Sequence, residues 1–191
     1  MKTLSHERVR MLTEGAVMVA LAQVLSLLKL YELPQGGSIT LDMIPIFLYC
    51  LRWGLRPGLT ASAAYAILQL ITSGYAWTWQ SVLGDYLFPF TLLGLCGLFR
   101  GVPGGTYLGT LAGCAARFLC HYVTGATVWA IYMPEEFFGL TMTSPWFYSL
   151  LYNGSYMAID AALCLIVFAL LGRTSLKKYL TGADLRPGGN G

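Results

Sequence analysis

The chain has 191 residues, of which 56% are hydrophobic and only 11% are charged, whereas soluble domains carry about 25% charged residues. One globular core of this size cannot enclose so much apolar surface, so the composition excludes a soluble fold and indicates a membrane protein. The formal net charge is +3, from 12 Lys and Arg against 9 Asp and Glu.

Six apolar segments predict six transmembrane helices, because about 20 apolar residues in a helix cross a bilayer. The first follows a polar start and is too long for a cleavable signal, so we expect it to be retained. The second and third are short and separated only by Gly54–Gly58, which predicts a helical hairpin whose first helix crosses incompletely. In chain order the predicted spans are Met11–Leu30, Met43–Trp53, Leu59–Thr72, Tyr86–Phe99, Tyr107–Tyr132 and Trp146–Leu171.

Basic residues gather on one side of this topology, so the positive-inside rule predicts that both termini are cytoplasmic. We therefore expect an all-α integral membrane protein with one transmembrane domain over residues 1–180 and a flexible, Gly-rich tail over residues 181–191. The bases on the inner side are Lys2, Arg8, Arg10, Arg52, Arg56, Arg100, Arg173, Lys177, Lys178 and Arg186. The acids assigned to the outer loops are Glu32, Asp42, Asp85, Glu135 and Glu136.

Small residues are patterned for packing. All five cysteines lie in apolar segments without metal or redox spacing, so neither a metal site nor a cofactor is expected. Gly105, Gly109 and Gly113 form one ridge on the fifth span, and Ala16 and Ala20 form another on the first. Such ridges let neighbouring helices approach closely, by default inside one chain.

Polar side chains at membrane depth are costly, so they mark candidate sites. On the fifth span Arg117, His121, Gly125 and Trp129 recur every four residues and share one helical face. Taken singly, these residues also have structural explanations. Arg117 is expected to form a buried ion pair with Asp160 of the sixth span, His121 can bond between helices, and tryptophans mark the membrane interface.

Together the polar residues are better explained by a ligand. A carboxylate, an imidazole, a tyrosine hydroxyl, an amide and indole rings converge on the outer half of the bundle. This set suits a flat, partly cationic heterocycle, which rings can sandwich while a carboxylate meets its charge. The residues are Asp85, His121, Trp129, Tyr148 and Asn153.

Four segments resemble the thiamine-specific S-component of energy-coupling factor (ECF) vitamin transporters, and the likeness runs from about Arg8 to Leu171. The elements HxxxGxxxW, beginning at His121, and YxxxxN, beginning at Tyr148, are specific to the thiamine members. The segments read GGSITLDMIPIFLYCLRWGLRPG, QSVLGDYLFPFTLLGLCGLFRG, HYVTGATVW and YSLLYNGSYM.

The resemblance implies a thiamine-binding subunit in the plasma membrane of a prokaryote, with no catalytic activity of its own. It would take the vitamin from the outer side and release it inward when docked on a transmembrane coupling subunit driven by two ATPases. The absence of a GxxxxGK[ST] phosphate loop agrees with ATP hydrolysis by partners. Thiamine and membrane lipid are the other expected partners, and no nucleic acid is expected.

The resemblance also implies roles for individual residues. Trp129 would stack on the aminopyrimidine, while Tyr148 and Asn153 would bond its edge. Asp85 would be the acidic partner, where some relatives have a glutamate, and His121 would line the thiazolium side.

Further roles follow from the same resemblance. Gly125 would leave room for the ligand, Tyr75 would contact it from the third-to-fourth loop, and Ala16 and Ala20 match an AxxxA motif that meets the coupling subunit. Some relatives carry a tryptophan in the first outer loop, where this chain has Gly36-Gly37. A second stacking ring is therefore expected from one of three other tryptophans, namely Trp77, Trp79 or Trp146.

Other functions remain as alternatives. An S-component for riboflavin or biotin would not explain a carboxylate beside His121, and one for hydroxymethylpyrimidine would leave Asp85 without a cation. An intramembrane enzyme could use His121, Asp85 or Asp160 as acid or base, but the chain lacks HExxH and GxSxG. An independent secondary transporter with six spans and no internal repeat would have to dimerise.

Overall fold

The computed structural model describes residues 2–73 and 76–185. Its helices are α1 (Lys2–Leu27), α2 (Met43–Trp53), α3 (Leu55–Ser73), α4 (Trp79–Ser81), α5 (Phe88–Thr91), α6 (Gly105–Thr127), α7 (Pro145–Leu171) and α8 (Lys177–Leu180), with a π-helical segment η1 (Val82–Leu87) and 3-10 segments η2 (Leu92–Phe99), η3 (Ala130–Tyr132) and η4 (Ala183–Leu185). Two small antiparallel hairpins complete it, β1 (Tyr31–Glu32) with β2 (Ser38–Ile39), and β3 (Glu136–Phe137) with β4 (Leu140–Thr141).

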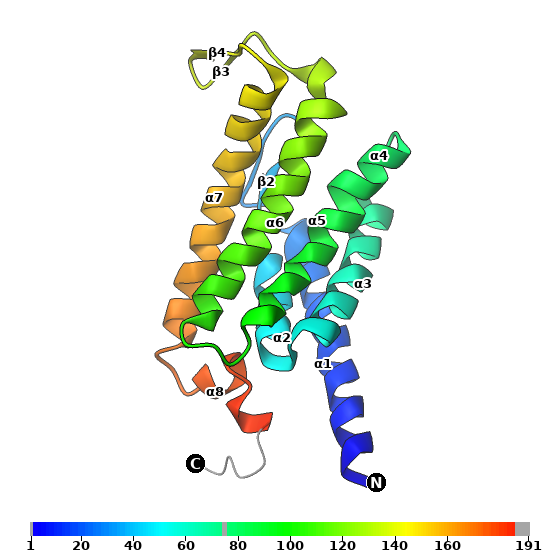
Figure 1. Ribbon diagram of the computed structural model, residues 1–191, viewed down its shortest axis with the longest axis vertical. Helices are drawn as coiled ribbons and strands as arrows, with labels where there is room; N and C mark the ends of the chain where they lie inside the picture. Colours follow the sequence, from blue (N-terminus) through cyan, green and yellow to red (C-terminus); the bar gives the residue numbers. More distant parts are fainter. Residues whose placement is uncertain (1, 74–75, 186–191) are drawn as a thin grey trace.

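The long helices run side by side as one bundle, so the expected all-α fold is confirmed (Figure 1). In the part of the chain that is described, three helices are long and apolar enough to cross a membrane, namely His6–Leu27, Trp79–Phe99 and Pro145–Leu171. The start of α1 and helix α8 lie at the same end of the bundle, hereafter the α8 end; the opposite end carries the β3–β4 hairpin (Figure 1). The six-span count and the cytoplasmic position of the termini stay predictions.

Helix α2 is short and central. Its 11 residues extend only about 16 Å at 1.5 Å per residue, about half of a 30 Å hydrocarbon core. Eight of these residues are buried, and Gly54, with φ +88°, joins α2 directly to α3 as the expected hairpin. Gly97 allows this turn to pack, because a Cβ there would lie 2.5 Å from the carbonyl carbon of Gly54.

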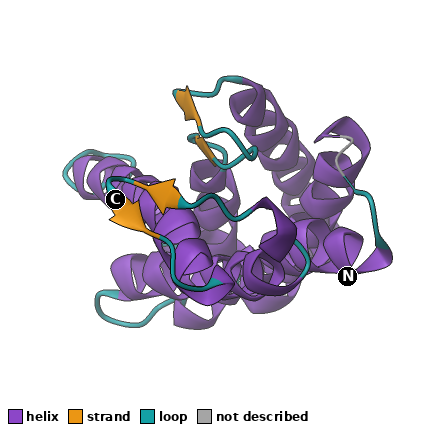
Figure 2. Cartoon of the chain, turned by 90° about the horizontal axis from the view of Figure 1, so that it is seen from above, coloured by secondary structure: helices purple, strands orange, loops and turns teal. Residues whose placement is uncertain are grey.

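A short α2 has a consequence for the chain before it. The β1–β2 hairpin is one of the two strand pairs seen from above in Figure 2. The chain after it leads to Asp42, the residue before α2, which is buried. Asp42 is 2% exposed, so its assignment to an outer loop is wrong. The outer-loop assignment treated the apolar run from Met43 as starting near the membrane surface, whereas it starts at depth.

The two small-residue ridges face different ways. The glycine ridge of α6 packs inside the chain, as expected by default: a Cβ on Gly109 would lie 2.7 Å from the carbonyl oxygen of Cys96, and one on Gly113 would lie 2.5 Å from the Phe47 ring. Ala16 and Ala20 instead lie on the exposed face of α1. The alanine face is therefore available to a partner or to lipid.

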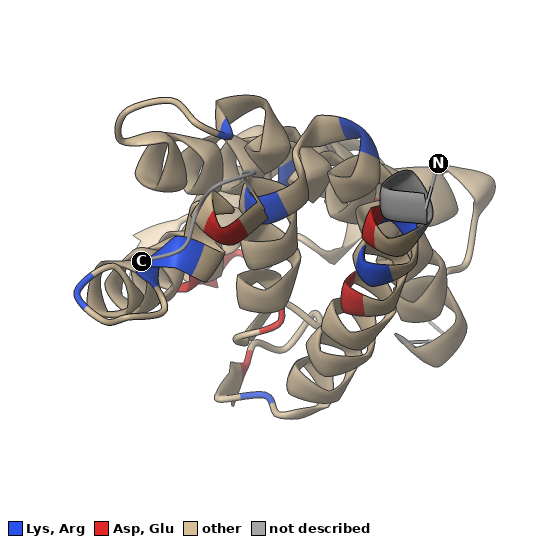
Figure 3. Ribbon diagram, turned by 90° about the horizontal axis from the view of Figure 1, so that it is seen from below, with Lys and Arg blue, Asp and Glu red and all other residues tan. Residues whose placement is uncertain are grey.

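An ion-pair network ties three parts of the chain together at the α8 end (Figure 3). Arg52 of α2, whose side chain is 5% exposed, bonds Glu14 of α1 at 2.6 Å and Asp184 at 2.5 Å. Arg10 contacts the same two carboxylates at 2.8 and 2.9 Å, and the Trp53 indole N–H donates to Glu14 at 2.7 Å. The flexible tail expected over residues 181–191 thus has described contacts at its start, and the residues from 186 on lie outside the described part.

Removal of the Asp184 charge should loosen this network. We expect Asp184→Asn to lower the melting temperature of the detergent-purified protein by several degrees, since hydrogen bonds to charged groups contribute about 1.5–3 kcal/mol and about 2–4 °C accompanies each kcal/mol in a chain of this length. Glu136→Gln, at an exposed acid near the other end, is the matched control and should leave the melting temperature unchanged.

The same contact predicts a pH dependence. The hydrogen bond from Arg52 holds the pKa of Asp184 below its usual value. The contact therefore stabilises the fold fully above the usual pKa, and this stabilisation is lost as the pH falls through the lowered pKa. Unfolding curves should show wild type to be more stable than Asp184→Asn at neutral pH, whereas the two proteins should have the same stability at strongly acidic pH. An equal difference in stability at both pH values would contradict this assignment.

Candidate functional site

Asp85 lies between two residues of the predicted stripe on α6. The Trp129 indole N–H donates to Asp85 Oδ2 at 2.7 Å, and His121 Nδ1 lies 3.5 Å from Asp85 Oδ1. All three are partly or largely buried. The structure thus brings together the carboxylate, the imidazole and the indole that the sequence places 36 and 44 residues apart.

The π-helical segment η1 positions the carboxylate. A π-helix accommodates an extra residue within a helix and re-aims the side chains that follow, and such segments are frequent at functional sites. Gly84 lets η1 approach α6, because a Cβ there would overlap the Thr124 side chain. Asp85, the next residue, therefore reaches the side chains at the end of α6.

Asn153 of α7 already has protein partners for its amide. Its Nδ2 donates to the carbonyl oxygen of His121 at 3.3 Å and to the carbonyl and hydroxyl oxygens of Ser149 at 3.1 and 3.0 Å. Its Oδ1 accepts from the Tyr156 hydroxyl at 2.8 Å. The Nδ2 group can bond a ligand edge only by exchanging one of these contacts, whereas Oδ1 accepts one hydrogen bond and has a second lone pair.

Gly125 lies at the contact between α6 and α7. A Cβ there would overlap Ser149 Oγ and lie 3.0 Å from Asn153 Nδ2. The room that Gly125 provides is used by α7, and the ligand contact that the resemblance implies stays a prediction. Its absence of a side chain still shapes the site, since it lets Asn153 approach His121.

Tyrosines line α7 next to this contact. Tyr148, Tyr152 and Tyr156 follow at intervals of one turn, with ring centroids 5.6 and 6.0 Å apart. Tyr148 is buried, and its hydroxyl has no hydrogen-bond partner within the described ranges. The backbone N–H of Gly37 donates to the Tyr152 hydroxyl at 2.9 Å, so the segment after β1 closes over the tyrosines.

The other expected aromatic residues lie elsewhere. Trp77 and Trp79 are 71% and 70% exposed, and Trp146 is 45% exposed with its ring packed on Tyr122 at 5.3 Å. The ring that contacts Trp129 is Tyr132, with centroids 5.8 Å apart, and the source of a second stacking ring stays a prediction. Tyr75 falls outside the described residues.

Deeper in the bundle, the expected ion pair between Arg117 and Asp160 is replaced by another. Arg117 Nη1 lies 3.6 Å from Asp42 Oδ2, and its guanidinium stacks 4.3 Å from the centre of the Phe90 ring. Asp160 instead accepts the backbone N–H of Thr40 at 3.0 Å. Asp42 was missed because it was assigned to a loop; the short length of α2 is the signal that could have located it.

Asp42 is also held by two hydroxyl groups. Thr40 Oγ1 donates to its Oδ1 at 2.5 Å and the Tyr65 hydroxyl to its Oδ2 at 2.6 Å. Gln69 in turn donates to the Tyr65 hydroxyl at 2.9 Å. A connected polar network therefore crosses the interior from α7 to α3.

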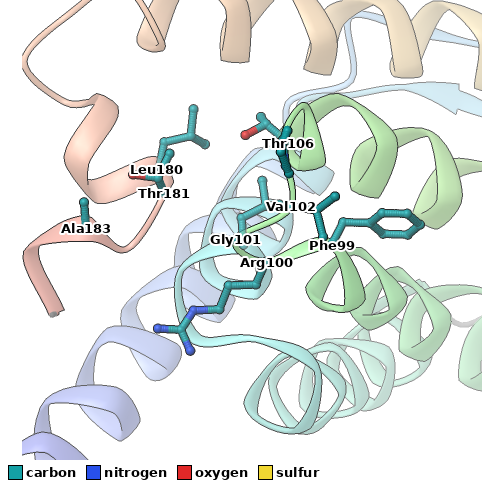
Figure 4. A pocket seen from close by; sticks show the side chains of 10 residues that line it. Phe99, Arg100, Gly101, Val102, Thr106, Leu180, Thr181 and Ala183 are labelled. Atoms are coloured by element: carbon teal, nitrogen blue, oxygen red, sulfur yellow. The ribbon is translucent and has the colours of Figure 1, made fainter.

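A cavity of about 320 Å³ opens at the α8 end and contains none of the predicted ligand residues (Figure 4). Arg100 is its one charged lining residue, and it is exposed. Without a buried polar group, this cavity lacks the chemistry of the Asp85 cluster.

Comparisons with known proteins agree with one another. A family model described as "Thiamine transporter protein" matches residues 12–180. The chain is 31% identical to the thiamine transporter ThiT of Bacillus subtilis (strain 168), over 90% of this chain and 94% of that protein. It is 27% identical to the thiamine transporter ThiT of Lacticaseibacillus paracasei, over 87% and 88% of the two chains. A solved structure of ThiT from Listeria monocytogenes has the same fold, with a TM-score of 0.78 at 22% identity over 91% of this chain and 98% of that one.

The packing role of Gly125 can be tested against a second glycine. We expect Gly125→Ala to lower the melting temperature, because its methyl group would overlap Ser149 at a close helix contact. Gly154→Ala on α7 is the matched control: the nearest atom, on Phe118, is 3.9 Å from the new Cβ, and alanine favours the helix. Equal melting temperatures for the two variants would contradict the close contact at Gly125.

Proposed function

Since the chain belongs to the thiamine transporter protein family, we propose that it binds thiamine for uptake as the S-component of an ECF-type transporter. The family consists of transport proteins, so the chain is not an enzyme and the intramembrane-enzyme alternative is set aside. We further propose that it resides in the plasma membrane of a bacterium and acts with a transmembrane coupling subunit and two ATPase subunits.

One observation carries the choice of ligand: Asp85 is held between Trp129 and His121. Thiamine joins an aminopyrimidine to a thiazolium ring that carries a permanent positive charge. A carboxylate at membrane depth attracts such a cation strongly because the surroundings are poor in water. The hydrogen bond from the indole N–H fixes the Trp129 ring, which limits the conformational freedom lost when a flat ring stacks on it.

The α7 side would read the edge of the pyrimidine. Tyr148 has a buried hydroxyl without a protein partner among the described residues, so it can bond a ligand without breaking an existing contact. Asn153 and Gly125 hold α7 against α6 beneath it. The Asp85 cluster favours thiamine over hydroxymethylpyrimidine or riboflavin, since neither of these carries a fixed positive charge.

Helix α1 is the proposed docking face for the coupling subunit. Ala16 and Ala20 are exposed on it, and small residues let another membrane helix approach closely. Gly15, Val19 and Ala22 are buried. Docking on the alanine face would therefore leave the internal packing of α1 intact.

Replacement of Trp129 tests the ligand site. Trp129→Ala should weaken thiamine binding by about tenfold or more, because a stacked aromatic pair contributes about 0.5–1.5 kcal/mol beyond the apolar area that it buries, and about 1.4 kcal/mol corresponds to a tenfold change in affinity. Calorimetric titration of the purified protein measures the dissociation constant. Trp79→Ala, at a 70% exposed tryptophan, should bind like wild type, and an unchanged affinity in Trp129→Ala would place the thiamine site elsewhere.

Replacement of the alanines tests the docking face. The double variant Ala16→Phe, Ala20→Phe should lose thiamine uptake by whole cells while the purified protein keeps its affinity for thiamine, since bulky rings would block a close helix contact. The control variant Val17→Phe, Val24→Phe changes two other exposed positions of α1 and should keep more uptake. Loss of binding in the alanine variant would show instead that the ridge supports internal packing.

A further inference from the structure

Two buried polar side chains lie deeper in the bundle than the ligand cluster. Arg117 precedes His121 by one turn of α6, and Asp160 follows Asn153 by about two turns of α7. Because α6 and α7 run side by side in opposite directions (Figure 1), both steps lead toward the α8 end. Arg117 and Asp160 therefore both lie on the inner side of the Asp85 cluster.

Both side chains have polar atoms left unused. Arg117 is 8% exposed and Asp160 is 0% exposed. In the part of the chain that is described, Arg117 Nε, Arg117 Nη1 and Asp160 Oδ2 have no hydrogen-bond partner. Proteins rarely leave such buried groups unpaired, so each requires a specific explanation.

The segment before α2 links the two side chains. Asp160 Oδ1 accepts from the Thr40 N–H at 3.0 Å, and Thr40 Oγ1 donates to Asp42 at 2.5 Å. Asp42 forms the ion pair with Arg117. One carboxylate oxygen of Asp160 is thus committed to holding Thr40. Its other oxygen and the Arg117 Nε–H have no hydrogen-bond partner among the described residues, and Arg117 Nη1 has only the 3.6 Å ion-pair contact with Asp42.

We propose that Arg117 and Asp160 form a hydroxyl-binding subsite at the floor of the thiamine site. Arg117 offers an N–H donor and Asp160 a carboxyl acceptor, and the two are linked through Thr40 and Asp42. An alcohol is the group that can accept one hydrogen bond and donate another. Thiamine carries such an alcohol on the hydroxyethyl arm of its thiazolium ring. With the pyrimidine on Trp129 and the thiazolium beside His121, this arm extends toward Arg117, so the inference rests on the proposed function.

The subsite would also select against phosphate esters of thiamine. An ionised phosphoryl group has oxygen acceptors but few or no protons to donate, so it cannot satisfy Asp160 Oδ2. It would also approach two carboxyl groups, Asp42 and Asp160, of which only Asp42 is paired with the Arg117 guanidinium. The free alcohol is therefore the preferred form of the ligand.

Calorimetric titration with three ligands tests the subsite: thiamine, an analogue in which an ethyl group replaces the hydroxyethyl arm, and thiamine monophosphate. Wild type should bind thiamine about tenfold or more tightly than the ethyl analogue, as expected for a hydrogen bond to a charged group. Asp160→Asn keeps an oxygen that can accept from Thr40 but replaces the second acceptor with a donor. The ratio of the dissociation constants of the ethyl analogue and thiamine should therefore fall to near one. Wild type should also bind the monophosphate more weakly than thiamine.

Two further variants separate the possible outcomes. Arg117→Lys keeps a cation opposite Asp42 but loses the Nε–H donor, so it should also reduce the preference for thiamine over the ethyl analogue. If Asp160→Asn does not fold, the result for Arg117→Lys tests the subsite in its place. Asp85→Asn should weaken thiamine and the ethyl analogue by the same factor, because Asp85 meets the ring cation and not the arm.

The failures are distinguishable. If wild type does not bind thiamine, the proposed function itself is wrong. If wild type binds thiamine but binds the ethyl analogue or the monophosphate equally well, or if neither Asp160→Asn nor Arg117→Lys changes the preference, the subsite is wrong and the proposed function stands.

Discussion

The buried guanidinium of Arg117 constrains the architecture around it. A cation in the middle of an apolar bundle requires a carboxylate within the same low-dielectric region, because an unpaired charge there is far more costly than one in water. Asp42 meets this requirement from a distant part of the chain. To deliver it, the chain after α1 enters the bundle, and α2 starts in the buried interior and ends near Asp184 at the α8 end.

This arrangement explains why the β1–β2 segment contacts α7. The residues that lead to Asp42 pass α7, where Gly37 bonds Tyr152 and Thr40 bonds Asp160. A side chain at position 37 would lie 2.8 Å from the Tyr156 ring, so the glycine is needed for this close passage. Gly37, one of the two glycines that stand where some relatives carry a tryptophan, therefore has a packing role in this chain.

Local patterns in the sequence predicted the fold class, the helical hairpin and the polar face of α6, since these depend on residues a few positions apart. The four-residue spacing from Arg117 to Gly125 requires only that the segment be helical. Trp129 was placed on the same face, but α6 ends at Thr127, so this residue lies just beyond the helix. The partner of Arg117 could not be found in this way, because depth in the bundle depends on where α2 begins and how the preceding loop runs. The sequence predicted that Trp129 and Asp85 lie in the same part of the bundle, but not that they form a hydrogen bond. That bond depends on the π-helical η1, which positions Asp85 and has no clear sequence pattern.

The proposed binding and docking regions lie on different parts of the bundle, and the contacts of α1 keep them apart. At the α8 end Glu14 ties α1 to Arg52, and along its buried face Gly15 packs on Tyr49. The ligand cluster is instead built from η1, α6 and α7, toward the opposite end. A change on the alanine face can reach the ligand cluster along two helices that pack on α1. One is α3, where Gln69 bonds Gln23 of α1 and which also packs on η1. The other is α2, which carries Arg52 of the network at the α8 end and begins directly after Asp42 of the interior ion pair. The short α2 thus joins the interior ion pair to the network at the α8 end.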